Sequence, residues 1–222
     1  MNSRWSIYLF VGFIALGTLA ATISAVTGAQ SRDEEADEDA LEDPLPSGVE
    51  LRVFVHRPRV LKPNHLGTCT PTNTESSNFE RTPWHLAGPI TWSLNRKSVP
   101  ASVAAGVDNV LTASFNAWYE NVFIQGQDTK VGRARLDKVN AILWKKLQRS
   151  TVGLTFVWFS RISGEVLEVD TVFNKRHPWA NFTGSDECQK SLDAPDAYDL
   201  QNIATHEFGH WAGRDDLFEN TD

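Results

Sequence analysis

The sequence has little cysteine, no internal repeat and no excess of basic residues. Its 222 residues carry 21 basic and 28 acidic side chains, which give a net charge of -7. Eight of these acidic residues lie between Asp33 and Asp43, so the rest of the chain is nearly neutral. A near-neutral domain offers no basic surface for phosphates, and we therefore expect no nucleic acid among its partners.

The first 29 residues have the composition of an export signal. They carry one charge, Arg4, followed by an uncharged run from Trp5 to Ala29 that ends in small residues. A basic start, an apolar middle and a small-residue end are typical of a signal peptide, which predicts a secreted, extracellular protein. The alternative is an uncleaved N-terminal anchor that holds an extracellular domain at the membrane, because the run exceeds the ~20 residues that span a bilayer.

Residues 30–50 are expected to form an acidic, disordered linker. Leu41 is the only large apolar residue of the acidic run, too little to offset the entropy of ordering the chain. Residues 51–222 then form the domain, with eight tryptophans in the chain to help build a core. Residues 62–83 are rich in Pro, Asn, Thr and Ser and are predicted to form a loop.

The hydrophobic pattern predicts strands interleaved with helices, an α+β fold. Alternating or continuous apolar residues predict strands at Leu51–His56 and at residues 89–95, 153–159 and 166–174. Apolar residues three and four apart predict a long helix from Val103 to Val122 and a second helix from Leu136 to Leu147.

The last helix is expected to run from Asp196 or Asp199 to Trp211. Its buried side should consist of apolar residues three and four apart, namely Leu200, Ile203, Ala204 and Phe208. This helix carries the run ATHEFGHWAGRDD, in which two histidines lie four residues apart with a glutamate after the first.

The spacing of His206 and His210 suits a metal, because residues four apart share one face of a helix. Glu207 lies about 100° round the helix from His206, beside the metal rather than on it. Gly213 can take the left-handed conformation that ends a helix and lets the chain return with Asp216 as a third ligand.

Two imidazoles and one carboxylate leave the fourth tetrahedral position open for water, which is the catalytic arrangement of Zn²⁺. The metal lowers the pKa of that water toward ~7. Glu207 is then placed to accept the proton of the water as it attacks a carbonyl, and is the predicted catalytic residue. No serine or cysteine nucleophile is needed.

The pattern H-E-x-x-H-x-x-G-x-x-H/D resembles that of the metzincin zinc metallopeptidases, and DLQNIATHEFGHWAG is similar to the active-site helix of matrixin-type members. The runs PITWSLN, SFNAWYENV and VDTVFN occur in the order of a matrixin catalytic domain, so the resemblance covers about residues 84–216. An aspartate as third ligand resembles the snapalysin-like branch.

The resemblance implies a metzincin-like fold and a peptidase activity. Its fold has a five-stranded twisted mixed sheet, a long packing helix and an active-site helix beneath the sheet. Its substrates are extended peptides laid against the edge strand, of which Asp170 and Asn174 resemble the polar positions. The resemblance thus implies an exported zinc-dependent endopeptidase that acts on protein or peptide substrates.

One departure concerns methionine. Metzincins place a turn containing methionine beneath the zinc, after the third ligand, whereas Met1 is the only methionine here. The sequence is therefore expected to be either a fragment of a longer reading frame, with its catalytic domain incomplete at the C-terminus, or a relative with a truncated lower subdomain. The alternative function is a truncated, non-catalytic secreted binding module.

The remaining candidates are two cysteines and four histidines. Cys69 and Cys188 are an even pair in an exported chain, which favours a disulfide. The other interpretation makes Cys69 an inhibitory zinc ligand from a prosegment, although LGTCTP lacks the arginine and charged surroundings of the matrixin cysteine switch. His177 is expected in a surface loop or lining the cleft. The other three are not expected to be ligands, namely His56, His65 and His85.

Overall fold

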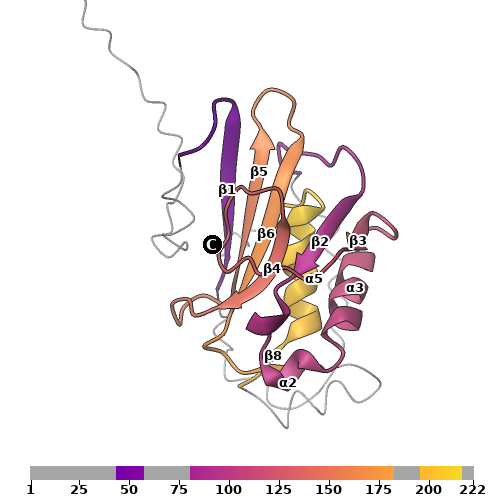
Figure 1. The fold of residues 1–222 in the computed structure, drawn as a ribbon, viewed down its shortest axis with the longest axis vertical. Coiled ribbons are helices and arrows are strands. Elements are labelled where there is room, and N and C mark those ends of the chain that lie inside the picture. Colours follow the sequence, from indigo (N-terminus) through magenta and orange to yellow (C-terminus); the bar gives the residue numbers. More distant parts are fainter. Residues whose placement is uncertain (1–43, 58–80, 183–195, 217–222) are drawn as a thin grey trace, which may run out of the picture. The chain divides into compact units, whose positions relative to one another are not determined.

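The computed structural model describes residues 44–57, 81–182 and 196–216. Within them it has a mixed six-stranded sheet with helices on one face, a mixed α/β architecture compatible with the α+β prediction (Figure 1). None of the helices in these ranges is both long enough and apolar enough to cross a membrane.

Several expectations concern residues outside the described ranges. They are the signal peptide or anchor, most of the acidic linker and of the loop at residues 62–83, and the histidine and cysteine candidates His65, Cys69 and Cys188.

The sheet has the strand order β1-β5-β6-β4-β2-β3. Its strands are β1 (Val49–His56), β2 (Ile90–Leu94), β3 (Phe123–Gln125), β4 (Asn140–Lys145), β5 (Gly153–Ser160) and β6 (Val166–Asn174). The first strand is antiparallel to β5, and β5 is antiparallel to β6, whereas the remaining neighbours are parallel. The four predicted strands are confirmed as β1, β2, β5 and β6, and β1 begins inside the segment expected to be linker.

Two features of the sheet differ from the implied fold. It contains six strands rather than five, because β1 adds to the outer side of β5. The expectation that Asp170 and Asn174 belong to an edge strand is wrong, since β6 lies between β5 and β4. Both side chains are buried and hold neighbouring backbone by hydrogen bonds: Asp170 accepts from the backbone N–H of Ala141 in β4 at 2.7 Å, and Asn174 accepts from that of Leu147 at 3.1 Å.

The predicted helix from Val103 to Val122 is broken. The described elements there are α2 (Ala101–Ala104) and α3 (Val107–Asn116). Gly106 separates them with a φ of 82°, a left-handed conformation that interrupts a right-handed helix. Apolar spacing continues across the break because both helices bury the same side, so periodicity alone did not reveal it.

The second predicted helix, Leu136–Leu147, is wrong. The middle half of it, Asn140–Lys145, is β4, whose inner residues are buried on both faces of the sheet. Leu143 packs in the cluster on one face and Ile142 in the cluster on the other. A strand buried on both sides is a continuous apolar run, and such a run contains the three- and four-residue spacings of a helix.

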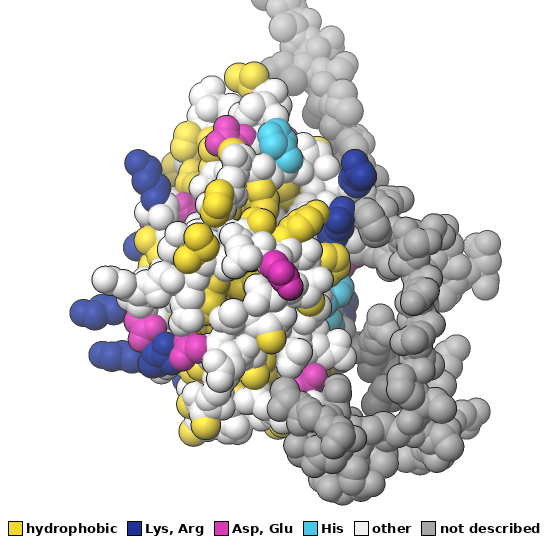
Figure 2. Space-filling model, turned by 90° about the vertical axis from the view of Figure 1, so that its right-hand side faces the viewer, with side chains coloured by type: hydrophobic (Ala, Val, Ile, Leu, Met, Phe, Trp, Pro, Cys, Tyr) yellow, Lys and Arg dark blue, Asp and Glu magenta, His cyan; other side chains and the backbone are white. Residues whose placement is uncertain are grey.

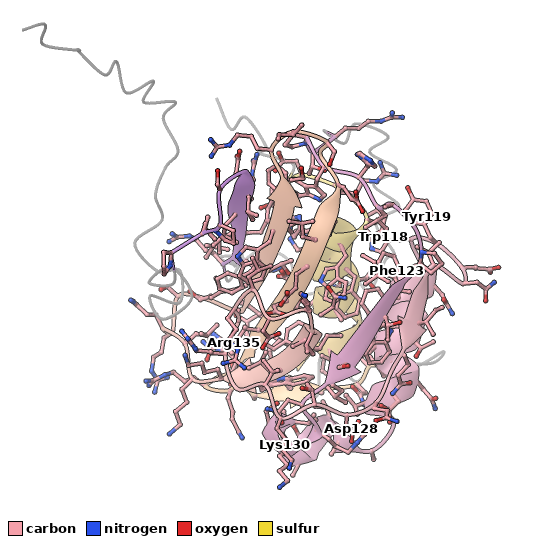
Figure 3. All side chains as sticks on the ribbon, turned by 45° about the horizontal axis from the view of Figure 1, so that its top comes forward. Trp118, Tyr119, Phe123, Asp128, Lys130 and Arg135 are labelled. Carbon is pink, nitrogen blue, oxygen red and sulfur yellow. The ribbon has the colours of Figure 1, made fainter. Side chains whose placement is uncertain are left out.

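Helix α5 (Leu200–Trp211) lies beside α3 on one face of the sheet, preceded by β8 (Tyr198–Asp199), which pairs with β7 (Trp179–Ala180) (Figure 1). The rings of Phe115 and Phe208 stack between the two helices, with centroids 3.6 Å apart. Trp118, labelled in Figure 3, follows α3 and donates its indole N–H to the carbonyl of Thr205 at 2.6 Å. These contacts hold α5 against α3 and thereby help to fix the helix that carries both site histidines.

The other face of the sheet is covered by a second apolar cluster and by the segment that contains Arg135 (Figure 3). Asp170 accepts from the backbone N–H of Arg135 at 3.0 Å, and burial raises its pKa well above the ordinary value. On the face drawn in Figure 2, acidic and basic side chains adjoin each other at the lower left. An example of such pairing is Arg96, which contacts both Asp108 and Asp128.

Gly209 is expected to be required by the packing of α5. A Cβ at this position would lie 2.7 Å from Cζ2 of Trp118, whose indole is held by Thr205. Overpacking costs about 1–3 kcal/mol, which exceeds the ~1 kcal/mol that alanine gains over glycine in a helix. Gly209→Ala should therefore lower the free energy of unfolding in urea, whereas Asn202→Ala on the exposed side should change it by less than about 0.5 kcal/mol. A Gly209→Ala protein as stable as the wild type would contradict this packing.

Candidate metal site

Local sequence sets both ends of α5. Its N-cap is Asp199, whose side chain accepts from the backbone N–H of Asn202 at 3.2 Å. At the other end Gly213 has a φ of 77°, and its N–H donates to the carbonyl of His210 at 3.1 Å. Arg214 N–H then donates to Gly209 O at 2.9 Å, so the chain reverses direction as the glycine predicts.

This reversal brings the three predicted ligands together. Nε2 of His206 lies 3.2 Å from Oδ1 of Asp216, and Nε2 of His210 lies 3.5 Å from the same oxygen. One ligand atom from each of the three residues lies within 4.8 Å of the other two. The arrangement has the donor set and the size of a three-ligand metal site.

The hydrogen bonds of His210 show which of its ring nitrogens could act as a ligand. Its Nδ1 lies 2.8 Å from the carbonyl oxygen of Arg214, which only accepts, so Nδ1 must carry the hydrogen. Burial lowers the pKa of His210, against the opposing effects of Glu207 and Asp216. The neutral ring then directs the lone pair of Nε2 at a carboxylate, and this buried atom has no hydrogen-bond partner among the described residues.

The structure separates the roles of two adjacent aspartates. Both oxygens of Asp215 accept from one guanidinium nitrogen of Arg52, at 2.9 and 3.2 Å. Asp216 instead faces the histidines; burial acts to raise its pKa, but the imidazoles lower it below its ordinary value. Asp216 is thus the ionised carboxylate nearest to the histidine nitrogens, as the spacing predicts.

Glu207 points away from solvent, onto β5. Its side chain is 0% exposed, and a Cβ on Gly153 would lie 2.9 Å from its Oε1, so a larger residue there would require the carboxylate to shift. Oε2 accepts from the hydroxyl of Thr155 at 2.6 Å. The carboxylate is therefore held by the sheet, one position round the helix from His206.

A chain of hydrogen bonds orients the hydroxyl that holds Glu207. The indole of Trp211, which can only donate, gives its N–H to Thr171 Oγ1 at 2.9 Å. The carboxylate can only accept, so Thr155 donates to Glu207 and must itself accept from Thr171, 2.9 Å away. All four side chains are buried, and each of the two hydroxyls can donate its hydrogen to only one partner in this series.

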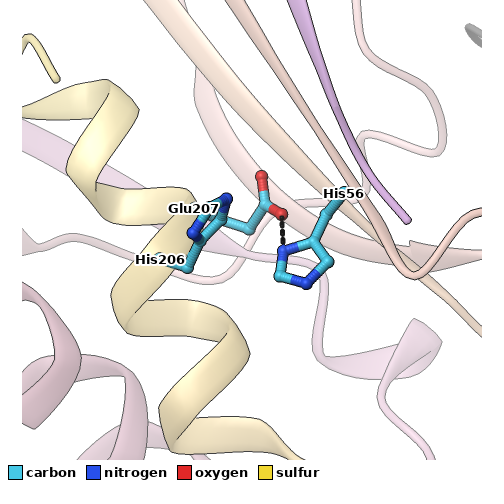
Figure 4. Close-up of side chains that lie close together, drawn as sticks. All are labelled: His56, His206 and Glu207. Atoms are coloured by element: carbon cyan, nitrogen blue, oxygen red, sulfur yellow. Dashed lines mark ion pairs between the residues drawn. The ribbon is translucent and has the colours of Figure 1, made fainter. Parts of the chain in front are cut away.

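His56 is the residue that sequence reasoning missed. Nδ1 of His56 lies 3.3 Å from Oε1 of Glu207, and its ring meets that of His206 edge-on with centroids 4.4 Å apart (Figure 4). The three residues form a second group able to hold a metal. Only the alternation of β1, which places Arg52, Phe54 and His56 on one face, could have suggested this position.

The surroundings set the charge of Glu207. Burial acts to raise the pKa of its carboxyl, but its contact with His56 and the electrostatic effects of His206 and His210 act to lower it, and the pKa lies below its ordinary value. The carboxylate is thus held in its ionised form, as a proton acceptor requires.

Two other histidines lie in neither group of candidate ligands. His85 is bonded through its backbone N–H to Gly164 O at 2.8 Å. Nε2 of His177 lies 2.9 Å from Thr151 O, and its ring is tilted against that of Tyr198.

Comparison with known proteins gives no match: no protein-family model, no curated protein and no solved structure is similar to this chain at a significant level. Its function is therefore argued from the geometry of the site.

Thr155 is expected to stabilise the fold through its bond to Glu207. Thr155→Val removes the hydroxyl but keeps the shape, and loss of a hydrogen bond to a buried charge should lower the free energy of unfolding by about 1.5–3 kcal/mol. Thr155→Ser keeps the hydroxyl and should lose only about 1 kcal/mol for its methyl group. Urea unfolding measures both, and equal losses in the two variants would show that the hydroxyl does not hold Glu207.

Proposed function

We propose that this protein is an exported zinc-dependent endopeptidase of the metzincin type. The observation that carries the proposal is the convergence of His206 Nε2, His210 Nε2 and Asp216 Oδ1, with the ionised Glu207 beside them. The substrate class is a protein or peptide, and export follows from the signal-like N-terminal sequence.

The residues present fit zinc. Two imidazole nitrogens and one carboxylate oxygen are ligands that Zn²⁺ takes in catalytic sites. The lone pair of the buried His210 Nε2 also needs a positive partner, because it faces a carboxylate. His210 is fixed for this role by Arg214 O, since an outer hydrogen bond of this kind sets the tautomer of a ligating imidazole.

The chemistry divides between the metal and Glu207. When bound, zinc supplies a Lewis acid that activates water and polarises the scissile carbonyl. Thr155 occupies Oε2 of Glu207, so the oxygen that would accept the proton of the attacking water is Oε1, which His56 Nδ1 contacts at 3.3 Å in this arrangement. Glu207 can then pass that proton to the leaving amine, so that one side chain serves as base and then as acid.

The arrangement of the chain is compatible with a metzincin-like fold. Strands β2 to β6 make five neighbours in the sheet, the number that the resemblance implies, and α3 and α5 pack on one face. The alternative function, a non-catalytic binding module, is favoured by one observation: Glu207 is completely enclosed.

Zinc affinity should depend on Asp216 and not on Asp215. We expect one zinc per chain by elemental analysis, a large loss of zinc affinity in His210→Ala and Asp216→Ala, and nearly normal affinity in Asp215→Ala, whose carboxylate is bound to Arg52. Titration with a chelator of known affinity compares them. Loss of zinc in Asp215→Ala with retention in Asp216→Ala would mean that the third ligand is the wrong aspartate.

Catalysis should depend on Glu207, whereas zinc binding should not. Glu207→Gln keeps the size of the side chain and an oxygen for Thr155, but an amide cannot accept the proton of water. Zinc content should stay near one per chain, and hydrolysis of labelled casein should fall by about 10²-fold or more, as expected for a positioned base. Undiminished hydrolysis in this variant would remove Glu207 from the mechanism.

A further inference from the structure

Strand β1 covers the candidate metal site. Its side chains alternate between the faces of the sheet, and three of the four on the side of α5 contact a site residue or its neighbour. Arg52 binds Asp215, Phe54 stacks on the ring of His210 with centroids 3.7 Å apart at 10°, and His56 lies on Glu207. One short strand thus contacts the site along its length.

This cover encloses the groups that would perform catalysis. Glu207 is 0% and His210 2% exposed. His56 stands 3.3 Å from the carboxylate oxygen that would accept a proton. Water and a peptide carbonyl need this space, so β1 and a substrate exclude each other.

The backbone of β1 is itself an extended peptide paired with β5. Its register is antiparallel over eight residue pairs, from Val49 opposite Ser160 to His56 opposite Gly153. Phe54 lies opposite Thr155, which holds Glu207. A peptide paired with the edge of β5 would therefore pass directly over Glu207, the proposed base.

We propose that β1 is an internal occupant of a peptide-binding edge on β5, and that an extended peptide takes its place when the site opens. The peptide pairs antiparallel with β5. It carries a basic residue where Arg52 lies and, two residues later, an aromatic residue where Phe54 lies. This inference rests on the proposed function for its catalytic meaning, although peptide exchange on β5 can be tested without catalysis.

Strand β1 is only partly buried, which would allow another peptide to replace it. Only Phe54, 4% exposed, is buried in this strand, and the other seven residues are half-buried, whereas seven of the eight residues of β5 are buried. The first strand is the outermost of the described sheet, and β5 is its one partner. Its removal leaves the main part of both apolar clusters between β5, β6, β4 and the helices.

Charge explains the preference for a basic residue. Asp215 accepts from Arg52 with both oxygens, and Asp216 lies next to it in the chain. Arg52 also lies 5.4 Å from the ring centroid of Phe54 and 6.0 Å from that of Trp84, within the range of a cation–π contact. A peptide with an acidic residue at this position would place like charges together.

A reversible cross-link in the full-length chain tests the exchange. Val49 and Ser160 are opposite each other, at the end of β1 away from His56. Opposed Cβ atoms lie about 4.5–5.5 Å apart, near the ~3.5–4.5 Å of a disulfide. In Val49→Cys/Ser160→Cys, oxidation holds β1 on β5 and reduction releases it. The two single variants and the wild type, each oxidised and reduced, control for the natural cysteines.

The probe is a fluorescein-labelled peptide with the sequence of residues 49–56, whose binding is measured by fluorescence polarisation. We expect the oxidised double variant to bind it at least tenfold more weakly than the same protein after reduction, with no such difference in the controls. A second peptide, with glutamate in place of the arginine, should bind the reduced protein at least tenfold more weakly than the first. Equal binding by the oxidised and reduced forms, or no binding by either, overturns the proposal.

Hydrolysis of labelled casein, measured on the same samples, separates this inference from the proposed function. If the cross-link blocks both peptide binding and hydrolysis, both proposals are supported. Peptide binding controlled by the cross-link without hydrolysis in any form would contradict the peptidase and leave β1 as the occupant of a binding edge. Hydrolysis that is equal before and after reduction would contradict the occupant and leave the peptidase.

Discussion

The burial of the charged Glu207 side chain is the constraint on which the rest of the site depends. A carboxylate removed from water is tolerated only with donors and positive partners around it. Thr155 supplies the donor, and the neighbouring imidazoles lower the pKa of the carboxyl. Because these partners lie on β5, β1 and α5, the requirement of one side chain fixes how the helix sits on the sheet. It also fixes the direction in which His206 and His210 point.

The parts of this account that sequence predicted are local. The start of the last helix, the four-residue histidine spacing and Gly213 act within a few turns of α5, and their geometry follows from helix periodicity and from one left-handed residue. The failures are non-local. A strand buried on both faces imitates the helix pattern between Leu136 and Leu147, and the role of His56 depends on the pairing of β1 with a strand about a hundred residues away. Neither the pairing of strands nor the enclosure of Glu207 is encoded in a short window.

Strand β1 both completes the site and blocks access to it. His56 contributes to the electrostatic balance that keeps Glu207 ionised, and it also occupies the approach to the free carboxylate oxygen. Phe54 covers the ring of His210 and contributes to its desolvation. Stability and access are therefore opposed here: contacts that protect a buried polar site are contacts that a substrate must replace. A base that is fully enclosed in one arrangement becomes available in another only if an outer strand moves.

The central claim is that a cation is held by His206, His210 and Asp216. X-ray absorption spectroscopy of the zinc-loaded, full-length protein tests it most directly, because it identifies the ligand atoms. The account predicts two imidazole nitrogens at about 2.0–2.1 Å and carboxylate oxygen at about 2.0–2.2 Å from zinc, with no sulfur. The same spectrum of Asp216→Ala should lose the carboxylate contribution and keep both imidazoles. A sulfur at about 2.3 Å, or a site unchanged in Asp216→Ala, would contradict the ligand set.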